Sequence, residues 1–99
     1  MGNLEYVLVR TEKAGVHFGF LEYEEARDGG YYVTLVNTRR VWSWSGANSL
    51  SDLALKGSKN PEQCKITAAI QRNKMFAIEI MRVHKESIDN INAIKDWTF

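Results

Sequence analysis

One segment of the chain brings together side chains and backbone groups that can hold an anionic ligand containing bases. It reads Thr38-Arg39-Arg40-Val41-Trp42-Ser43-Trp44-Ser45-Gly46-Ala47-Asn48-Ser49-Leu50. Tryptophan rings stack on nucleobases, and arginine binds phosphate oxygens in bidentate geometry. The free N–H groups at the start of a helix attract anions. The segment therefore predicts a nucleotide site.

An arginine pair is followed by two tryptophans in the first half of this segment. Arg39 and Arg40 are the candidates for phosphate, and Trp42 and Trp44 would stack on bases or frame the site. If the segment is a strand, Arg40, Trp42 and Trp44 share one face. Either tryptophan could instead fill the core. The arginines could equally pair with one of three acidic residues, Glu22, Glu24 or Asp52.

The second half of the segment resembles the start of a helix. Ser49-Leu50-Ser51-Asp52 looks like a capping box with Asp in place of the usual Glu, and Asn48 is an equally suitable N-cap. We expect Asn48, Ser49 and Ser51 to offer hydrogen bonds to the ligand. His17 could join them from a neighbouring strand.

Elsewhere the sequence contains no recognisable catalytic or metal-binding motif. The single cysteine, Cys64, has no His or Cys near it in the sequence, so no zinc site is expected. Its apolar, alternating surroundings favour a buried side chain over a nucleophile paired with His17 or His84. The phosphate-binding glycine motifs are missing. We therefore predict a protein that is not an enzyme and that needs neither cofactor nor metal.

Length and charge limit the class of protein. With 99 residues, 44% of them hydrophobic, residues 1–99 should form one domain with a real core. A net charge of +1 argues against general attraction to nucleic acid polymers or to membranes. The sequence shows no signal peptide and no apolar run near the about 20 residues that span a bilayer, which predicts a cytoplasmic protein. Small domains bury a smaller share of their surface on folding than large ones, and association would add stability. We therefore also expect a homo-oligomer, either a dimer or a tetramer.

Hydrophobic patterning predicts an α+β fold with a small, mainly antiparallel sheet, a short central helix and a short C-terminal helix. Strands are expected over Leu4–Arg10, Val16–Glu24, Tyr31–Asn37, Cys64–Ile70 and Met75–Val83. The last of these could also be helical. Residues 39–44 either continue the third strand or begin a fourth. The central helix would end at Gly57, and the C-terminal helix would cover residues 84–92.

Turn residues predict how these strands connect. Gly19 inside the second strand indicates a bulge or a close approach of another backbone. Asp28-Gly29 is a strong hairpin signal. The polar run Gln71-Arg72-Asn73-Lys74 is expected to be a turn. The first strand carries apolar residues on both faces, so we expect it at the centre of the sheet.

The central segment resembles a family of small, mostly uncharacterised phage proteins. Their shared core reads approximately Arg-Arg-(Ile/Val)-Trp-x-Trp-x-Gly-Ala-x-Ser-Leu-(Ser)-x-Leu-Ala-x-x-Gly, which matches this chain from Arg39 to Gly57. Further matches are Pro61-Glu62-Gln63-Cys64-Lys65, Val9-Arg10-Thr11, Ala14-Gly15-Val16-His17-Phe18-Gly19, and Ile78-Glu79-Ile80 leading to Trp97. The chain departs from the pattern at Ser43, often an aromatic residue, and at Arg82, often a proline.

This family looks similar to phage anti-CBASS sponges, oligomeric proteins that sequester the cyclic nucleotide signals of bacterial immunity. The resemblance implies a non-catalytic immune-evasion protein in the cytoplasm of the infected host, with a cyclic dinucleotide or related signal as ligand. A symmetric dimer would present each arginine and tryptophan twice, matching two phosphates and two bases. The alternative is a small phage structural or host-protein-binding protein without a nucleotide ligand. A phosphodiesterase that degrades the signal ranks last.

Overall fold

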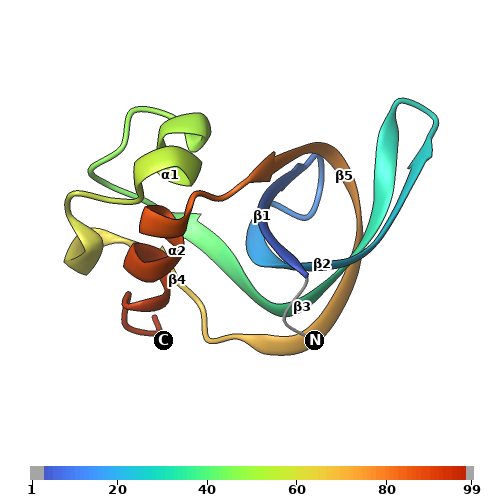
Figure 1. Ribbon diagram of the computed structural model, residues 1–99. Coiled ribbons are helices and arrows are strands. Elements are labelled where there is room, and N and C mark those ends of the chain that lie inside the picture. Colours follow the sequence, from blue (N-terminus) through green and yellow to red (C-terminus); the bar gives the residue numbers. More distant parts are fainter. Residues whose placement is uncertain (1–3, 98–99) are drawn as a thin grey trace.

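The computed structural model describes residues 4–97, and its centre is an antiparallel sheet that closes on itself (Figure 1). The closed sheet consists of β2 (Val16–Arg27), β1 (Glu5–Thr11), β5 (Ile70–Arg82) and β3 (Gly30–Ser43), with β3 pairing back to β2. The other elements are β4 (Lys65–Ile66) beside β3, the 3-10 turn η1 (Pro61–Gln63), and the helices α1 (Leu50–Lys56) and α2 (Lys85–Asn92). The predicted α+β class, with one central and one C-terminal helix, is confirmed.

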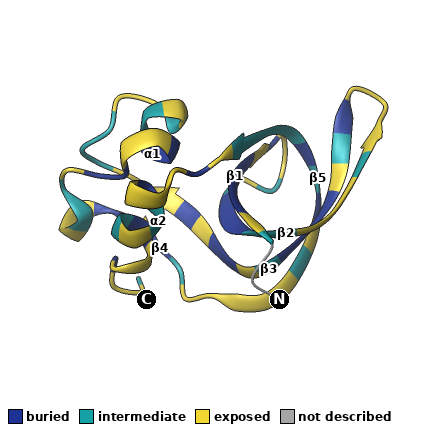
Figure 2. Cartoon of the chain, in the orientation of Figure 1, coloured by how far each residue is buried: buried dark blue, intermediate teal, exposed yellow. Residues whose placement is uncertain are grey.

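β1 lies between β2 and β5, as its two apolar faces predicted. Val7 and Val9 pack inside the closed sheet, whereas Tyr6 and Leu8 pack with α1 and α2 on its outer side. Figure 2 shows the resulting run of buried residues along β1. The strand therefore separates two small cores, and each of its faces contributes to one of them.

A tight turn joins β2 to β3. Asp28 and Gly29 have φ angles of 48° and 82°, and Arg27 pairs with Gly30 across them. Positive φ at both central residues is typical of the two-residue turn that Asp-Gly favours, so the sequence-based prediction is confirmed. The hairpin extends away from the helices, and its turn is exposed (Figures 1 and 2).

A bulge makes β3 one long bent strand. Asn37 has a φ of 52°, and the pairing of β2 with β3 shifts register between Phe18 and Phe20. Between them lies Gly19, where a Cβ atom would stand 3.0 Å from Cβ of Leu35 and 3.1 Å from Cβ of Thr38. The glycine thus allows the close approach that its position predicted. Because the bulge changes the alternation, Leu35 and Thr38 both face Gly19.

The predicted turn over residues 71–74 is wrong. These residues belong to β5, which pairs with β3 from Ile70 to Ala77. Of the strand predicted over Cys64–Ile70, Lys65 and Ile66 form β4 and Ile70 begins β5. Backbone pairing with β3 holds the polar run in the sheet, and Arg72 adds two exposed hydrogen bonds to the Glu22 carboxylate, at 2.9 and 2.8 Å. Local sequence patterns do not reveal ion pairs between residues that lie far apart in the sequence.

Arg39 joins the sheet to α2. Its side chain is buried, and its guanidinium donates to the carbonyl oxygens of Thr67 and Ile91, both at 2.8 Å, and of Ile94 at 3.0 Å. It also forms an ion pair with Asp96 at 3.2 Å. The last carbonyl groups of a helix lack partners within the helix, so a cation there is stabilising.

None of the helices in the described residues is long and apolar enough to cross a membrane.

Replacing Arg39 should destabilise the fold. Arg39→Ala would leave several buried carbonyl groups without a donor, and we expect the free energy of unfolding to fall by about 3–5 kcal/mol. Urea denaturation followed by tryptophan fluorescence measures this change. Arg40→Ala is the matched control, because Arg40 is exposed and should change stability by less than about 0.5 kcal/mol. Equal losses for both variants would contradict the assigned role of Arg39.

Candidate functional site

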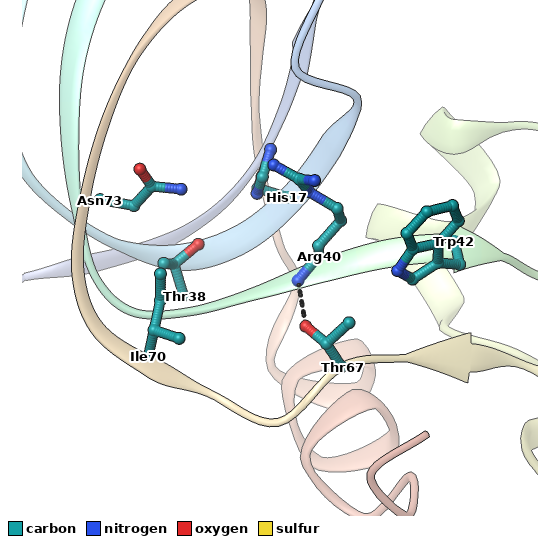
Figure 3. Close-up of a pocket in the computed structure, with 7 residues that line it drawn as sticks. All are labelled: His17, Thr38, Arg40, Trp42, Thr67, Ile70 and Asn73. Atoms are coloured by element: carbon teal, nitrogen blue, oxygen red, sulfur yellow. Dashed lines mark hydrogen bonds between the residues drawn. The ribbon is translucent and has the colours of Figure 1, made fainter. Parts of the chain in front are cut away.

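A cavity of about 220 Å³ opens beside the bulge of β3, between β2, β3 and the chain from β4 to β5 (Figure 3). Seven residues line it, and none of them is acidic. They are His17, Thr38, Arg40, Trp42, Thr67, Ile70 and Asn73. The cavity therefore combines one permanent cation and one large aromatic ring with several neutral polar groups.

Arg40 and Trp42 form the exposed rim of the cavity. Both come from the same face of β3, because the intervening Val41 points into the core. Trp42 is 55% exposed, so it is not a core residue. The backbone N–H of Arg40 donates to Thr67 Oγ1 at 3.0 Å, which joins the rim to the β4–β5 connection (Figure 3). The Arg40 guanidinium has no carboxylate partner among residues 4–97.

His17 is a buried wall residue opposite Arg40. The two residues are direct partners in the β2–β3 pairing. Nε2 of His17 lies 2.7 Å from the carbonyl oxygen of Ala14, which can only accept, so Nε2 carries the hydrogen and Nδ1 keeps a lone pair. Burial lowers the pKa of His17, the Ala14 hydrogen bond partly opposes this, and the charge of Arg40 lowers the pKa further. The ring is therefore neutral at physiological pH.

Thr38 contributes a hydroxyl group that has no partner within the described chain. The residue is only 2% exposed, and Oγ1 makes no hydrogen bond. Buried hydroxyl groups in native proteins are nearly always hydrogen-bonded, because leaving one unpaired costs free energy. Solvent does not reach Oγ1, so the unpaired hydroxyl belongs to the close packing of β3 against β2 at Gly19.

Of the eight residues predicted for the site, the structure brings together His17, Arg40 and Trp42. Arg39 has to be withdrawn, because its guanidinium is buried on the opposite face of β3 and is saturated by carbonyl groups. Trp44 lies beyond the end of β3, and although it is 37% exposed it does not line the cavity.

The start of α1 does not offer the predicted anion site. Ser49 is the N-cap, and its Oγ accepts from the N–H of Asp52 at 3.2 Å. The Asp52 carboxylate accepts from the N–H of Asn48 at 3.3 Å, one residue before the N-cap, so only the Ser49 half of the predicted capping box forms. Ser51 donates to Met81 Sδ at 3.7 Å. Because the carboxylate already occupies the helix start and would repel a second anion, Asn48, Ser49 and Ser51 are withdrawn from the site.

Three other cavity residues, Thr67, Ile70 and Asn73, carry no local signal for a site. Asn73 lies in the run predicted to be a turn, and the pairing of β5 with β3 brings it to the cavity. Cys64 is buried, as its apolar surroundings predicted. Within residues 4–97, no three His, Cys, Asp or Glu side chains lie close enough together to hold a metal ion.

Residues 4–91 match a protein family described as a domain of unknown function (DUF6948), and the chain belongs to this family. No curated protein matches the sequence, and no solved structure matches it. The family match therefore covers nearly the whole described fold but names no activity. The observations that bear on function are those of the cavity.

The neutral state of His17 predicts a pH dependence of stability. Because its pKa is lower in the folded protein than the usual 6.5, its contribution is complete above pH 6.5. Below that pH the unfolded chain binds the proton first, so the free energy of unfolding should fall by up to about 1.4 kcal/mol per pH unit. This loss continues until the folded protein is protonated as well.

Urea denaturation between about pH 8 and pH 5 measures this effect, because the range spans the ordinary histidine pKa. His17→Gln should remove the histidine-dependent part of the decline. His84→Gln should leave it unchanged, since His84 is exposed. A decline that is identical in wild type and His17→Gln would show that His17 does not titrate in this way.

Proposed function

We propose that this protein binds a nucleotide without transforming it, and that it sequesters cyclic dinucleotide or related signals of bacterial anti-phage defence. One observation supports this most directly: Arg40, whose guanidinium has no carboxylate partner among residues 4–97, shares the rim of a cavity with the exposed indole of Trp42. Guanidinium groups bind phosphate and indoles stack on bases. In keeping with the resemblance to phage sponges, we propose that it acts in the cytoplasm of an infected host.

Charge supports an anionic ligand. The cavity has one cation and no lining carboxylate, so the local potential is positive although the whole chain carries only +1. Nearby acidic residues are already engaged: Glu22 binds Arg72 and Asp96 binds Arg39. A phosphate at Arg40 would therefore meet a cation that has no competing partner within the described chain.

The size of the cavity supports a homo-oligomer. Sites that enclose drug-sized ligands have volumes of about 300–1,000 Å³, whereas this cavity measures about 220 Å³. One copy can therefore enclose only part of a cyclic dinucleotide. Two copies related by a twofold axis would offer two cavities to the two halves of such a ligand. The rim residues, Arg40 and Trp42, would then lie at or near the contact between copies.

The polar groups of the cavity support binding rather than hydrolysis. General acid–base catalysis needs titratable groups poised near the operating pH. Among the lining residues only His17 titrates in that range, and its Nε2–H is held by the Ala14 carbonyl. The remaining groups, such as Thr38 and Asn73, donate and accept hydrogen bonds without exchanging protons near neutral pH.

A second function, binding of a host or virion protein, is favoured by the aromatic surface next to the cavity. The ring centroids of Trp42 and Trp97 lie 5.6 Å apart, and Lys65 Nζ lies 5.5 Å from the centroid of Trp97. Ile70 is also 53% exposed. Aromatic residues are enriched at protein interfaces. Detection of the protein in purified phage particles would favour this alternative.

Binding can be tested with the purified chain. We would incubate it with cyclic di- and trinucleotides and with cyclic ADP-ribose, remove free ligand by gel filtration, and heat the protein to denature it. Mass spectrometry should then detect an intact ligand released by heating. Failure to retain any member of the panel would refute the proposal, and a ligand recovered in cleaved form would point to an enzyme.

Matched variants should assign binding to the rim. Arg40→Gln and Trp42→Ala should each weaken binding by about tenfold to a hundredfold, the effect expected for one phosphate contact or one stacked base. Arg27→Gln on the β2–β3 hairpin and Trp44→Ala beyond β3 remove the same side-chain types away from the cavity. Both controls should bind like wild type, as measured by isothermal titration calorimetry. Equal weakening by Trp42→Ala and Trp44→Ala would place the ligand elsewhere.

A further inference from the structure

The first half of β5 has an open edge. β3 pairs with β5 from Ile70 to Ala77, whereas β1 pairs with the other side of β5 only from Ala77 to Arg82 (Figure 1). Along residues 71–76, the edge that faces away from β3 therefore has no strand beside it in the described part of the chain. In an antiparallel pair, every second residue directs its N–H and C=O groups away from the partner strand. These groups are available to an added strand.

The edge is open because β1 ends in a tight turn. Thr11, the last residue of β1, lies opposite Ala77 of β5. Its N–H donates to the carbonyl oxygen of Gly15 at 3.0 Å, and its hydroxyl accepts from the N–H of Ala14 at 2.8 Å. Gly15 has a φ of 85°, and β2 begins directly after it. The turn thus carries the chain away from β5 at the point where a longer β1 would have continued along it.

A groove of about 440 Å³, the β5 groove, occupies this place. It lies between the β1–β2 turn at residues 11–14 and β5 at residues 74–78, and its lining is mostly apolar. Met75 is buried and Phe76 is half-buried. The ring centroid of Phe76 lies 5.1 Å from that of Tyr32, a contact that holds the ring in place. Proteins that bind peptides by strand addition combine an open sheet edge with such pockets for alternate side chains.

Charge restricts which segment fits the β5 groove. Lys13 and Lys74 line it and are exposed, and neither forms an ion pair within residues 4–97. Glu12 is the one acidic residue among the described lining residues. Met75 belongs to the core inside the closed sheet, so Lys74 lies on the outer face of β5. An added strand that alternates apolar and acidic residues would direct the apolar ones toward Met75 and the acidic ones toward Lys74.

A second copy of this chain suits the edge less well. If two copies of β5 paired in antiparallel fashion with Asn73 opposite Asn73, Arg72 of each copy would face Lys74 of the other. Like charges directly opposite each other destabilise a strand pair. Positive charges on an open edge are a common protection against pairing with an identical edge. The same charges attract an acidic segment.

We propose that the open edge of β5 binds an extended acidic segment of another protein, which joins the sheet as an additional strand. Its apolar side chains fill the β5 groove at Met75 and Phe76, and its carboxylates meet Lys13 and Lys74. The β5 groove shares no lining residue with the cavity at Arg40. The inference is therefore independent of the proposed nucleotide binding.

The test uses the purified protein and capped, fluorescently labelled peptides of about eight residues, a usual strand length. One set alternates glutamate with valine, leucine or tyrosine, and a matched set carries lysine in place of glutamate. In fluorescence anisotropy, the best acidic peptide should bind at least about tenfold more tightly than its lysine counterpart, because the β5 groove attracts one and repels the other. N-methylation of the edge-facing backbone nitrogens of that peptide should abolish binding, since it removes hydrogen bonds to β5.

Charge reversal in the protein locates the contact. Lys74→Glu should weaken binding of the acidic peptide at least about tenfold and strengthen binding of the lysine peptide, and Lys74→Gln should have an intermediate effect. Lys56→Glu is the matched control, because it reverses an exposed lysine on α1 that does not line the β5 groove. It should bind like wild type. Arg40→Gln at the cavity should also leave peptide binding unchanged.

Several results would overturn the inference. They are failure of wild type to bind any acidic peptide, equal binding of acidic and lysine peptides, and unchanged binding after N-methylation. Sedimentation velocity tests for a second copy at the same edge. Self-association of wild type that Lys74→Glu changes and Lys56→Glu does not would identify another copy as the occupant, and would also overturn the inference. These outcomes leave the proposed nucleotide binding untouched, because the cyclic nucleotide panel tests it separately.

Discussion

The contact between the Arg39 guanidinium and the carbonyl groups at the end of α2 sets the arrangement of the whole molecule. It ties β3 to the C-terminal part of the chain, including Ile91 and Ile94. It also fixes which face of β3 lies against the helices at this position. Because side chains alternate along a strand, Arg39 on the helix-covered face places Arg40 on the other face of β3, next to the cavity. Two adjacent arginines thus have opposite roles, one structural and one available to a ligand.

Much of the fold could be predicted from local sequence signals. Alternation located β1 and β2, Asp28-Gly29 fixed the hairpin, and Ser49 with Asp52 marked the start of α1. The errors concern features that depend on distant partners. The polar run over residues 71–74 forms a strand because the distant strand β3 supplies its backbone hydrogen bonds. Closure of the sheet by the pairing of β2 with β3 also carries no local signature.

The site was predictable only in part, because some of its residues are placed by contacts with distant parts of the chain. Strand parity correctly aligned Arg40 with Trp42, and His17 was correctly placed on the neighbouring strand. Residue type alone could not separate Arg39 from Arg40, because the partners of Arg39 lie more than twenty-five residues further along the chain. Thr38 lies in the same segment, but its burial depends on the packing of β3 against β2 at Gly19, which is not a local property of the sequence.

The closed sheet has a consequence for when the cavity exists. Its walls come from β2 near the start of the chain, from β3, and from β5 in the last third, so only a chain that extends from His17 to Asn73 contains all of them. The cavity forms only when synthesis has passed β5 and the sheet has closed. A ligand that binds only this complete form adds its binding free energy to the stability of the entire chain. Occupied molecules would therefore unfold less often and survive proteolysis longer than empty ones, so that ligand supply would itself regulate how much of the protein accumulates.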